Sequence, residues 1–426
     1  MNKIVYLANS FPEAVEPYVW EEIRELRNRG RAVLACSFRQ PRHVPEHVAG
    51  LAAETFYVFP LRARFAMYTC WMCISRHKLI LDLLWRAIRG PEPIQQRVRT
   101  LAHTWLGAYL AVALRKEKIG HFHVHHGYFS SWAGMVAARF LDAGFSMTLH
   151  GSDLLVRADY LDIKLKSCRF CPSISEFNRN YIRQRFPAID PGKILVHRLG
   201  VDLDFWRPLA NPVPRTVFFI LSVGRLHPIK NHEFLIHACY ELKNAGAHFR
   251  CTIVGDGDER ESLRDVIRNL RLENEVELRG HVSPQELPQL YSQADVVVLT
   301  SHSEGIPQAL MEAMAMERIV LAPDITGLPE LIMNNQTGFL YLPNSMADFL
   351  GKLTLIAAAE PSFNRIGHEA RRHISARFNR TRNLKRWADD FLRRVEGGAD
   401  KKEVGYANPV LQQVQLPVQR DRSIPV

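Results

Sequence analysis

Two glutamates, Glu304 and Glu312, stand eight residues apart in the part of the sequence that is best suited to chemistry. Residues 295–300 (DVVVLT) are β-branched and almost wholly apolar, which is typical of a buried parallel strand. Residues 303–306 then predict a tight loop, and residues 307–316 predict a helix with proline in its first turn. This order of strand, loop and helix start predicts a ligand at the carboxyl edge of a parallel sheet.

The ligand predicted at this edge has an anionic part and a hydroxylated part. The loop and helix start at Gly305, Ile306 and Pro307 offer free amides and a positive helix end, which favour an anion such as a diphosphate. Glu304 and Glu312 would repel phosphates but can accept hydrogen bonds from vicinal hydroxyl groups of a sugar or ribose. The alternative is that both are solvated acidic residues near a helix start, where negative charge is favoured anyway.

Two cations, Arg225 and Lys230, directly follow the strand predicted at residues 216–224. Both are therefore expected at the same sheet edge, where they can bind a diphosphate and the charge that develops on a leaving oxygen. The alternative is a pair of exposed surface cations. Because these cations and the helix amides already supply counter-charge, neither a metal ion nor another cofactor is predicted.

A candidate histidine, His150, follows the strand predicted at residues 145–149, and the adjacent Gly151 lets a ligand approach the backbone. Its imidazole is expected to orient a sugar or to hydrogen-bond the hydroxyl groups of that sugar. A general-base role would require the ring to lie within about 3 Å of the acceptor hydroxyl. Asp153 is equally well explained as a helix cap.

Other histidines and cysteines have patterns that invite a metal interpretation. Three histidines alternate along one predicted strand and share a face: His121, His123 and His125. No carboxylate stands at a suggestive spacing, so a partly buried strand end without metal is predicted. The pairs Cys70/Cys73 and Cys168/Cys171 have metal-like spacing but lie in apolar or strand-like segments, and the interpretation is buried free thiols.

Strands and helices alternate along both halves of the chain. In the first half, strands are predicted at residues 4–8, 32–37, 120–125, 145–149, 172–175 and 195–199, and helices at 16–29, 100–116 and 132–141. In the second half, strands are predicted at residues 216–224, 249–255, 276–279, 295–300 and 318–322, and helices at 233–245, 259–270, 284–293, 307–316 and 348–359. This alternation predicts an α/β protein of two Rossmann-like, doubly wound domains that face a central cleft.

The length of 426 residues also favours two domains over one core. The predicted division is 1–205 for the first domain, 206–380 for the second and 381–396 for a final helix, with a disordered tail at 397–426. No apolar run is long enough to span a membrane. The chain enters a strand-like segment at once, so no signal peptide is predicted and a cytoplasmic location is expected.

The net charge of +11 predicts affinity for an acidic partner. Part of this charge lies at residues 61–89, where large apolar side chains are interleaved with Arg62, Arg64, Arg76, Lys78, Arg86 and Arg89. Such a segment suits either a basic amphipathic helix on anionic lipid or an ordinary surface helix packed on its own domain. Nucleic acid is a weaker alternative, because the sequence has no zinc finger, RNA-binding signature or basic helix-turn-helix.

Several motifs together resemble the retaining glycosyltransferases of family 4, which have the two-domain GT-B fold. The central block is residues 303–315 (SEGIPQALMEAMA). The other blocks are residues 149–153 (LHGSD), 173–178, 199–202, 222–226 (SVGRL) with 230–231, 253–257, 327–331 and 337–340. They stand in the order and spacing of the family and extend over most of residues 1–395. One departure is the loop at residues 9–17, which lacks the glycine pair of many relatives.

The resemblance implies a hexosyltransferase-type enzyme that moves a sugar from a nucleotide-diphosphate sugar to a glycan or lipid-linked glycan. Among its look-alikes are enzymes of exopolysaccharide and colanic acid synthesis, so a peripheral place on the inner face of the cell membrane is expected. It further implies that Glu304 lies near the transferred sugar, Glu312 near the ribose and His150 near the donor, and that the last helix crosses back to the first domain. A nucleotide-sugar epimerase or hydrolase on the same fold is the alternative.

Overall fold

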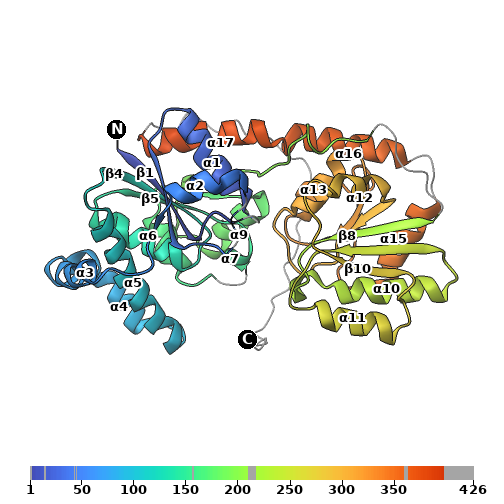
Figure 1. Cartoon of the computed structure of the whole chain (residues 1–426), viewed down its shortest axis with the longest axis horizontal. Coiled ribbons are helices and arrows are strands. Elements are labelled where there is room, and N and C mark those ends of the chain that lie inside the picture. Colours follow the sequence, from blue (N-terminus) through green and yellow to red (C-terminus); the bar gives the residue numbers. More distant parts are fainter. Residues whose placement is uncertain are drawn as a thin grey trace.

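Two parallel sheets, one in each half of the chain, form the centres of the molecule (Figure 1). The computed structural model describes residues 2–13, 16–42, 44, 46–155, 158–209, 217–358 and 363–397. The predicted tail beyond residue 397 and residues 210–216, which follow the predicted division between the domains, lie outside this part of the chain. The α/β class predicted from the alternation of strands and helices is confirmed.

The first sheet has five strands in the order β3-β2-β1-β4-β5, and all its neighbouring strands are parallel. The strands are β1 (Lys3–Ser10), β2 (Val33–Arg39), β3 (Phe56–Tyr57), β4 (Ile119–His125) and β5 (Gly144–Thr148). A parallel pair, β6 (Cys171–Ser173) and β7 (Ile194–Val196), continues beside β5 through a bridge between Leu149 and Ser173. The interior of these strands is buried on both faces, as their apolar runs predict.

Helices cover both faces of the first sheet: α1 (Pro17–Asn28), α2 (Ala49–Glu54), α3 (Ala63–Ser75), α4 (Leu81–Arg89), α5 (Ile94–Leu114), α6 (Phe129–Phe140), α7 (Ser152–Leu155), α8 (Leu161–Ser167) and α9 (Glu176–Arg185). Helices α5 and α6 pack on each other, and the buried Trp132 donates from Nε1 to Oγ1 of Thr104 over 2.9 Å. The predicted helix at residues 61–89 is two helices, α3 and α4, because a 3₁₀ turn at His77–Leu79 separates them.

The second sheet has six parallel strands in the order β10-β9-β8-β11-β12-β13. They are β8 (Phe218–Val223), β9 (Phe249–Val254), β10 (Val276–Gly280), β11 (Val296–Val298), β12 (Ile319–Pro323) and β13 (Phe339–Tyr341). The surrounding helices are α10 (His232–Asn244), α11 (Arg260–Asn269), α12 (Leu287–Gln293), α13 (Gln308–Ala315), α14 (Leu328–Leu331) and α15 (Met346–Ala358). The order places β8 and β11 side by side, so the loops that follow them share one edge.

Two final helices join the halves of the molecule. Figure 1 shows α16 (Phe363–Arg377) and α17 (Arg380–Val395) end to end along one side of both sheets. Helix α17 buries Trp387 and Phe391 in the same cluster as Tyr6 of β1. At its start, Arg380 forms ion pairs with Glu21 of α1 at 2.9 Å and with Asp202 at 2.7 Å.

Candidate functional site

Two loops, one from each half of the molecule, meet at the carboxyl ends of the sheets. Residues 149–151 follow β5, and residues 303–306 lie between β11 and α13. A Cβ atom on Gly305 would stand only 2.7 Å from the carbonyl oxygen of His150, so glycine is required for this close approach. The structure therefore brings the predicted residues His150 and Glu304, which are far apart in the sequence, into one site.

Glu304 is held by two donors from its own half of the molecule. Its Oε1 lies 2.5 Å from Nζ of Lys230 and 2.6 Å from Oγ of Ser301. The side chains of Lys230 and Glu304 are only 18% and 10% exposed, so water screens their attraction weakly. Both residues were predicted at this edge, but the ion pair between them was not.

Arg225 lies at the same edge, in the loop that follows β8. Gly255 and Gly257, in the loop after β9, pack closely on the backbone around Arg225. A Cβ atom on Gly255 would clash with the carbonyl oxygen of Gly224, and one on Gly257 with that of Leu226. Within the described ranges, no hydrogen bond or ion pair involves the Arg225 side chain, which is exposed. Its guanidinium is therefore available to an anion at this edge.

Glu312 lies on α13 and is held by a tyrosine. Its Oε2 accepts a hydrogen bond from the hydroxyl of Tyr291 over 2.9 Å. Burial raises the pKa of Glu312 to about 7, although the bond from Tyr291 opposes this shift. Pro307 is the N-cap of α13, not a residue of its first turn as predicted, because its extended backbone leads into the helix.

This raised pKa predicts that donor binding depends on pH near neutrality. Below pH 7 Glu312 gains a proton and loses part of its capacity to accept hydrogen bonds from the ribose hydroxyls that the family resemblance predicts as its ligands. The KM for the donor is therefore expected to rise as pH falls below 7, by up to about tenfold per pH unit. Glu312→Gln should flatten the profile of KM against pH, and the exposed control Glu261→Gln should keep it. A wild-type KM that is constant between pH 5.5 and 8 would contradict this role.

The backbone around His150 is organised by Asp153. This fully buried carboxylate accepts hydrogen bonds from the amides of His150 at 3.0 Å, Gly151 at 2.8 Å and Gly127 at 2.9 Å. Its pKa is lowered well below the ordinary range: burial alone would raise it, but the hydrogen bond and the positive charge of His126 outweigh that effect. Asp153 therefore does more than cap a helix as predicted, because its carboxylate binds backbone amides in the loops after both β4 and β5.

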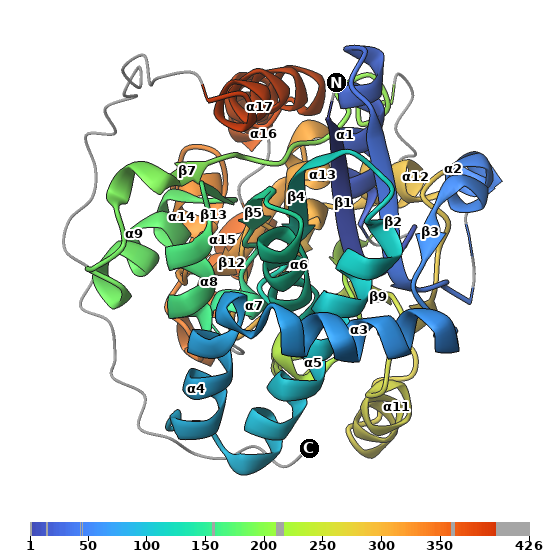
Figure 2. The ribbon, with the colours of Figure 1, turned by 90° about the vertical axis from the view of Figure 1, so that its left-hand side faces the viewer.

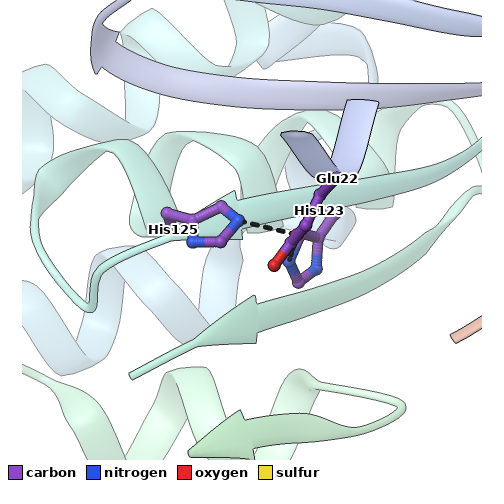
Figure 3. A group of neighbouring side chains, drawn as sticks. All are labelled: Glu22, His123 and His125. Carbon is purple, nitrogen blue, oxygen red and sulfur yellow. Dashed lines mark hydrogen bonds and ion pairs between the residues drawn. The ribbon is translucent and has the colours of Figure 1, made fainter. Parts of the chain in front are cut away.

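The histidines of β4 are fully buried, so the predicted partly buried strand end is wrong. His121, His123 and His125 are at most 3% exposed. The rings of α17 cover this face: Phe391 lies 5.1 Å from the ring of His123, centroid to centroid. A carboxylate does accompany the histidines, since Glu22 of α1 points at His123 and His125 (Figure 3). Sequence spacing could not reveal it, because Glu22 comes from a distant helix.

Glu22, His123 and His125 form the group of possible metal ligands found within the described part of the chain. Their atoms are already engaged without an ion. Nε2 of His125 lies 3.0 Å from Oε2 of Glu22, whereas the nitrogens of His123 contact Ser146 at 2.8 Å and Thr148 at 3.2 Å. These contacts fit a hydrogen-bond network better than a metal centre.

The two cysteine pairs differ from each other. Cys168 and Cys171 are buried free thiols, as predicted, and burial raises the pKa of both. Cys70 is exposed and Cys73 half-buried, so the buried position predicted for that pair is wrong. The reason is that Cys70 lies on the outward face of α3, a helix that buries only Thr69 and Met72.

A further glutamate, Glu330 of α14, links the halves of the molecule beside the site. Its carboxylate accepts hydrogen bonds from the backbone amides of Glu176 at 2.9 Å and Phe177 at 2.6 Å. These amides are the first in α9, where a negative charge is favoured. The sequence places Glu330 in the motif at residues 327–331 but does not predict this contact, because a partner 153 residues away leaves no local pattern.

Comparisons with known proteins agree with this architecture. Residues 210–373 match the family model described as glycosyl transferases group 1. The chain is 27% identical over 412 residues to the provisionally assigned colanic acid biosynthesis glycosyltransferase WcaL of Salmonella typhimurium, covering 91% of this chain and 96% of the relative. The chain is therefore similar to the group 1 glycosyl transferases, and the match with the family model lies in its second half. The amylovoran biosynthesis glycosyltransferase AmsK of Erwinia amylovora is 27% identical over 398 residues, covering 88% of this chain and 96% of that protein.

Solved structures show the same fold as this chain. Sucrose-phosphate synthase from Thermosynechococcus elongatus aligns with a TM-score of 0.73 at 18% identity, covering 94% of this chain and all of that one. Anabaena Alr3699/HepE, solved in complex with UDP, aligns with a TM-score of 0.70 at 17% identity, covering 92% and 99% of the two chains. These neighbours are GT-B glycosyltransferases with two Rossmann-like domains, and the predicted GT-B fold is confirmed.

Proposed function

We propose that this glycosyltransferase moves a sugar, with retention of anomeric configuration, from a nucleotide-diphosphate sugar to a glycan or lipid-linked glycan acceptor in cell-surface polysaccharide synthesis. The observation that carries the proposal is the meeting of Glu304, Lys230 and His150 where the loops of the two halves touch. Cations, carboxylates and a half-buried imidazole there suit a diphosphate joined to a polyhydroxylated sugar. The names of WcaL and AmsK support the polysaccharide role.

In this proposal different residues bind the diphosphate, the transferred sugar and the ribose of the donor. Arg225 and Lys230, with the amides of Gly305 and Ile306 and the helix start after Pro307, bind the diphosphate and stabilise the charge on the leaving oxygen. Glu304 accepts hydrogen bonds from the transferred sugar, Glu312 from the ribose, and His150 orients the sugar. Lys230 contacts Glu304, so a single cation links the sugar and diphosphate parts of the donor.

The test is incubation of the full chain with a panel of nucleotide sugars, with and without a lipid-linked glycan acceptor. Release of nucleoside diphosphate that depends on acceptor, with retained anomeric configuration in the product by NMR, is the expected result. Epimerisation of the donor, or diphosphate release that no acceptor stimulates, would instead favour an epimerase or hydrolase. Inversion at the anomeric carbon would contradict the retaining mechanism.

Transfer is expected to be independent of metal ions. Arg225, Lys230 and the start of α13 supply the counter-charge that a divalent cation would otherwise provide. An excess of EDTA should leave turnover nearly intact, whereas Arg225→Ala should raise the KM for the donor and lower kcat together. Loss of activity in EDTA that magnesium or manganese restores would contradict this expectation.

We also propose that the enzyme works at an anionic membrane surface. No described helix combines the length and apolar character needed to cross a bilayer. Instead, α3, α4 and the start of α5 expose large apolar side chains, among them Trp71 at 58%, Ile74 at 75% and Ile94 at 72%. Figures 1 and 2 show these helices on the side of the first domain that faces away from the second.

Basic residues accompany this apolar surface, which we define as the exposed side chains Met67, Trp71, Ile74, Leu81, Trp85, Ile88, Ile94 and Val98. Exposed cations on the same helices and turns include Arg64, Lys78, Arg89 and Arg99. The side chain of Arg89 lies 3.7 Å from the centroid of the Trp85 ring. Aromatic and aliphatic groups with cations beside them fit the headgroup region of an anionic bilayer.

The full chain is therefore expected to sediment with phosphatidylglycerol vesicles at low salt and to come off as salt rises. Each engaged basic residue contributes about 1 kcal/mol, and salt screens this attraction. Replacing Trp71, Ile74 and Trp85 by serine should weaken binding, whereas the control Leu342→Ser with Leu355→Ser, two exposed apolar sites on the second domain, should not. Equal binding to anionic and neutral vesicles, or binding to neither, would contradict the proposal.

A further inference from the structure

A line of hydrogen bonds runs from the buried carboxylate of Glu22 to His150. Oε2 of Glu22 lies 3.0 Å from Nε2 of His125, and Nδ1 of His125 lies 3.1 Å from Nε2 of His150. Figure 3 shows the side chains of Glu22 and His125 joined by the first of these contacts. Both are buried in the first domain, whereas His150 is half-buried where the two domains meet. The line therefore connects the interior of the first domain with the candidate site.

The donors and acceptors along this line are determined by its carboxylate end. An ionised carboxylate only accepts hydrogen bonds, so Nε2 of His125 carries a proton and donates it to Glu22. The hydroxyl of Tyr6 donates to the same oxygen over 3.0 Å. If His125 carries this single proton, its lone pair is on Nδ1, and His150 must donate from Nε2. In a neutral His150, the lone pair consequently lies on Nδ1.

Burial and a neighbouring positive charge together disfavour protonation of His150. The ring of His126 lies 4.4 Å from that of His150, centroid to centroid, and its nitrogens face Glu16 at 2.9 Å and Asp153 at 3.7 Å. Burial lowers the pKa of His126, but these two carboxylates raise it to about 10, so His126 is a cation. Burial, and then the charge of His126, lower the pKa of His150 well below its ordinary value.

We propose that Glu22 and His125 are positioning residues that hold His150 as the Nε2–H tautomer, with Nδ1 free to accept a hydrogen bond from a hydroxyl group of the donor sugar or acceptor. The hydroxyl ligand rests on the proposed function; the tautomer does not. Nδ1 of His150 makes no hydrogen bond to other residues within the described ranges. Tyr18 stacks on the imidazole at 4.6 Å and limits rotation of the ring.

The direct test is the tautomer itself, read from ¹⁵N shifts of the full chain labelled at histidine. The variants His150→Phe and His125→Phe assign the signals. At pH 7 we expect Nε2 to carry the proton in both His125 and His150, and Nδ1 of His150 to carry none. In Glu22→Gln, whose amide can also donate, the His150 signal should lose its single tautomer. A His150 that is protonated on Nδ1, or cationic at pH 7, overturns the proposal whether or not a donor is found.

The second test is kinetic and uses the donor that the nucleotide-sugar panel identifies. His125→Phe should lower kcat about 10- to 100-fold, since a small displacement of a group that contacts substrate costs about that much. The double variant His125→Phe/His150→Phe should be no slower than His150→Phe alone, because one residue acts through the other. If the two losses in kcat multiply in the double variant, His125 does not act through His150 and the proposal is overturned. If His150→Phe lowers kcat but shows no coupling to His125→Phe, the proposed function stands, and only the positioning role of Glu22 and His125 is rejected.

A control variant separates positioning from packing. His121 lies on the same strand as His125 and is equally buried, but its Nε2 lies 2.7 Å from Oγ of Ser146, and no hydrogen bond or ion pair joins it to Glu22, His125 or His150 among the described residues. His121→Phe should lower the melting temperature without changing the His150 tautomer. Stoichiometric zinc in the purified wild-type chain, lost in Glu22→Gln, would overturn the proposal in favour of a metal site.

Discussion

Glu304→Gln is expected to slow sugar transfer about 30- to 1000-fold. The wild-type carboxylate is largely buried and accepts hydrogen bonds from Lys230 and Ser301. In the proposed complex it also accepts a hydrogen bond from the sugar. Loss of one charged hydrogen-bond partner at such a site costs about 2–4 kcal/mol. The measurement is kcat/KM for the donor, with Glu261→Gln, an exposed glutamate of α11, as the control. Unchanged transfer kinetics on the true donor would reject the assignment.

The ion pair with Lys230 makes this prediction sharper. If Glu304 served only to neutralise Lys230, then Lys230→Ala/Glu304→Gln would restore part of the activity that either single change removes. If Glu304 and Lys230 bind different parts of the donor, the double variant is at least as slow as the slower single one. We expect the second result. Melting curves of all three variants separate loss of fold from loss of chemistry.

The sequence predicts the sheets of this protein better than its small helices. Strands such as β8 and β11 are buried on both faces, so their apolar runs carry a strong signal. Helix α9 was missed because it is short and highly polar, and it buries only Asn178 and Ile182. Its start depends on Ser175, whose side chain accepts from the amide of Asn178, and on Glu330 from the other half. Such a helix forms mainly through tertiary contacts.

The sequence predicts the sheet edge at which the candidate site lies, but not the contacts between the side chains there. Arg225, Lys230 and Glu304 follow strands, and parallel strands bring their carboxyl ends to one edge. The pairing of Lys230 with Glu304, 74 residues away, has no counterpart in local spacing. One signal could have revealed Glu22: it shares the apolar stripe of α1 with Val19, Ile23 and Leu26. A carboxylate on a buried stripe needs a partner inside the fold.

The loop that carries His150 should depend on Asp153 more than on any single apolar contact. Asp153→Asn leaves one acceptor oxygen for three backbone amides and removes one of the two carboxylates that face the His126 cation. Breaking a buried charge pair costs about 3–5 kcal/mol. For a domain of this size that corresponds to a melting temperature lower by about 6–20 °C. Differential scanning calorimetry measures it, with the exposed Asp265→Asn as control.

The pH dependence of stability gives an independent check on Asp153. Its pKa is lower in the folded protein than in the unfolded chain, so its contribution is fully present above about pH 4 and is lost as pH falls further. The difference in unfolding free energy between wild type and Asp153→Asn should therefore be constant near neutrality and shrink in acid. A melting temperature that Asp153→Asn leaves unchanged, or a gap that persists undiminished at the lowest pH where both proteins fold, would show that the loop is held without this carboxylate. In that case the backbone position of His150 would have to come from the other contacts of its carbonyl oxygen, which are Nδ2 of Asn178 at 3.4 Å and Gly305 of the second domain.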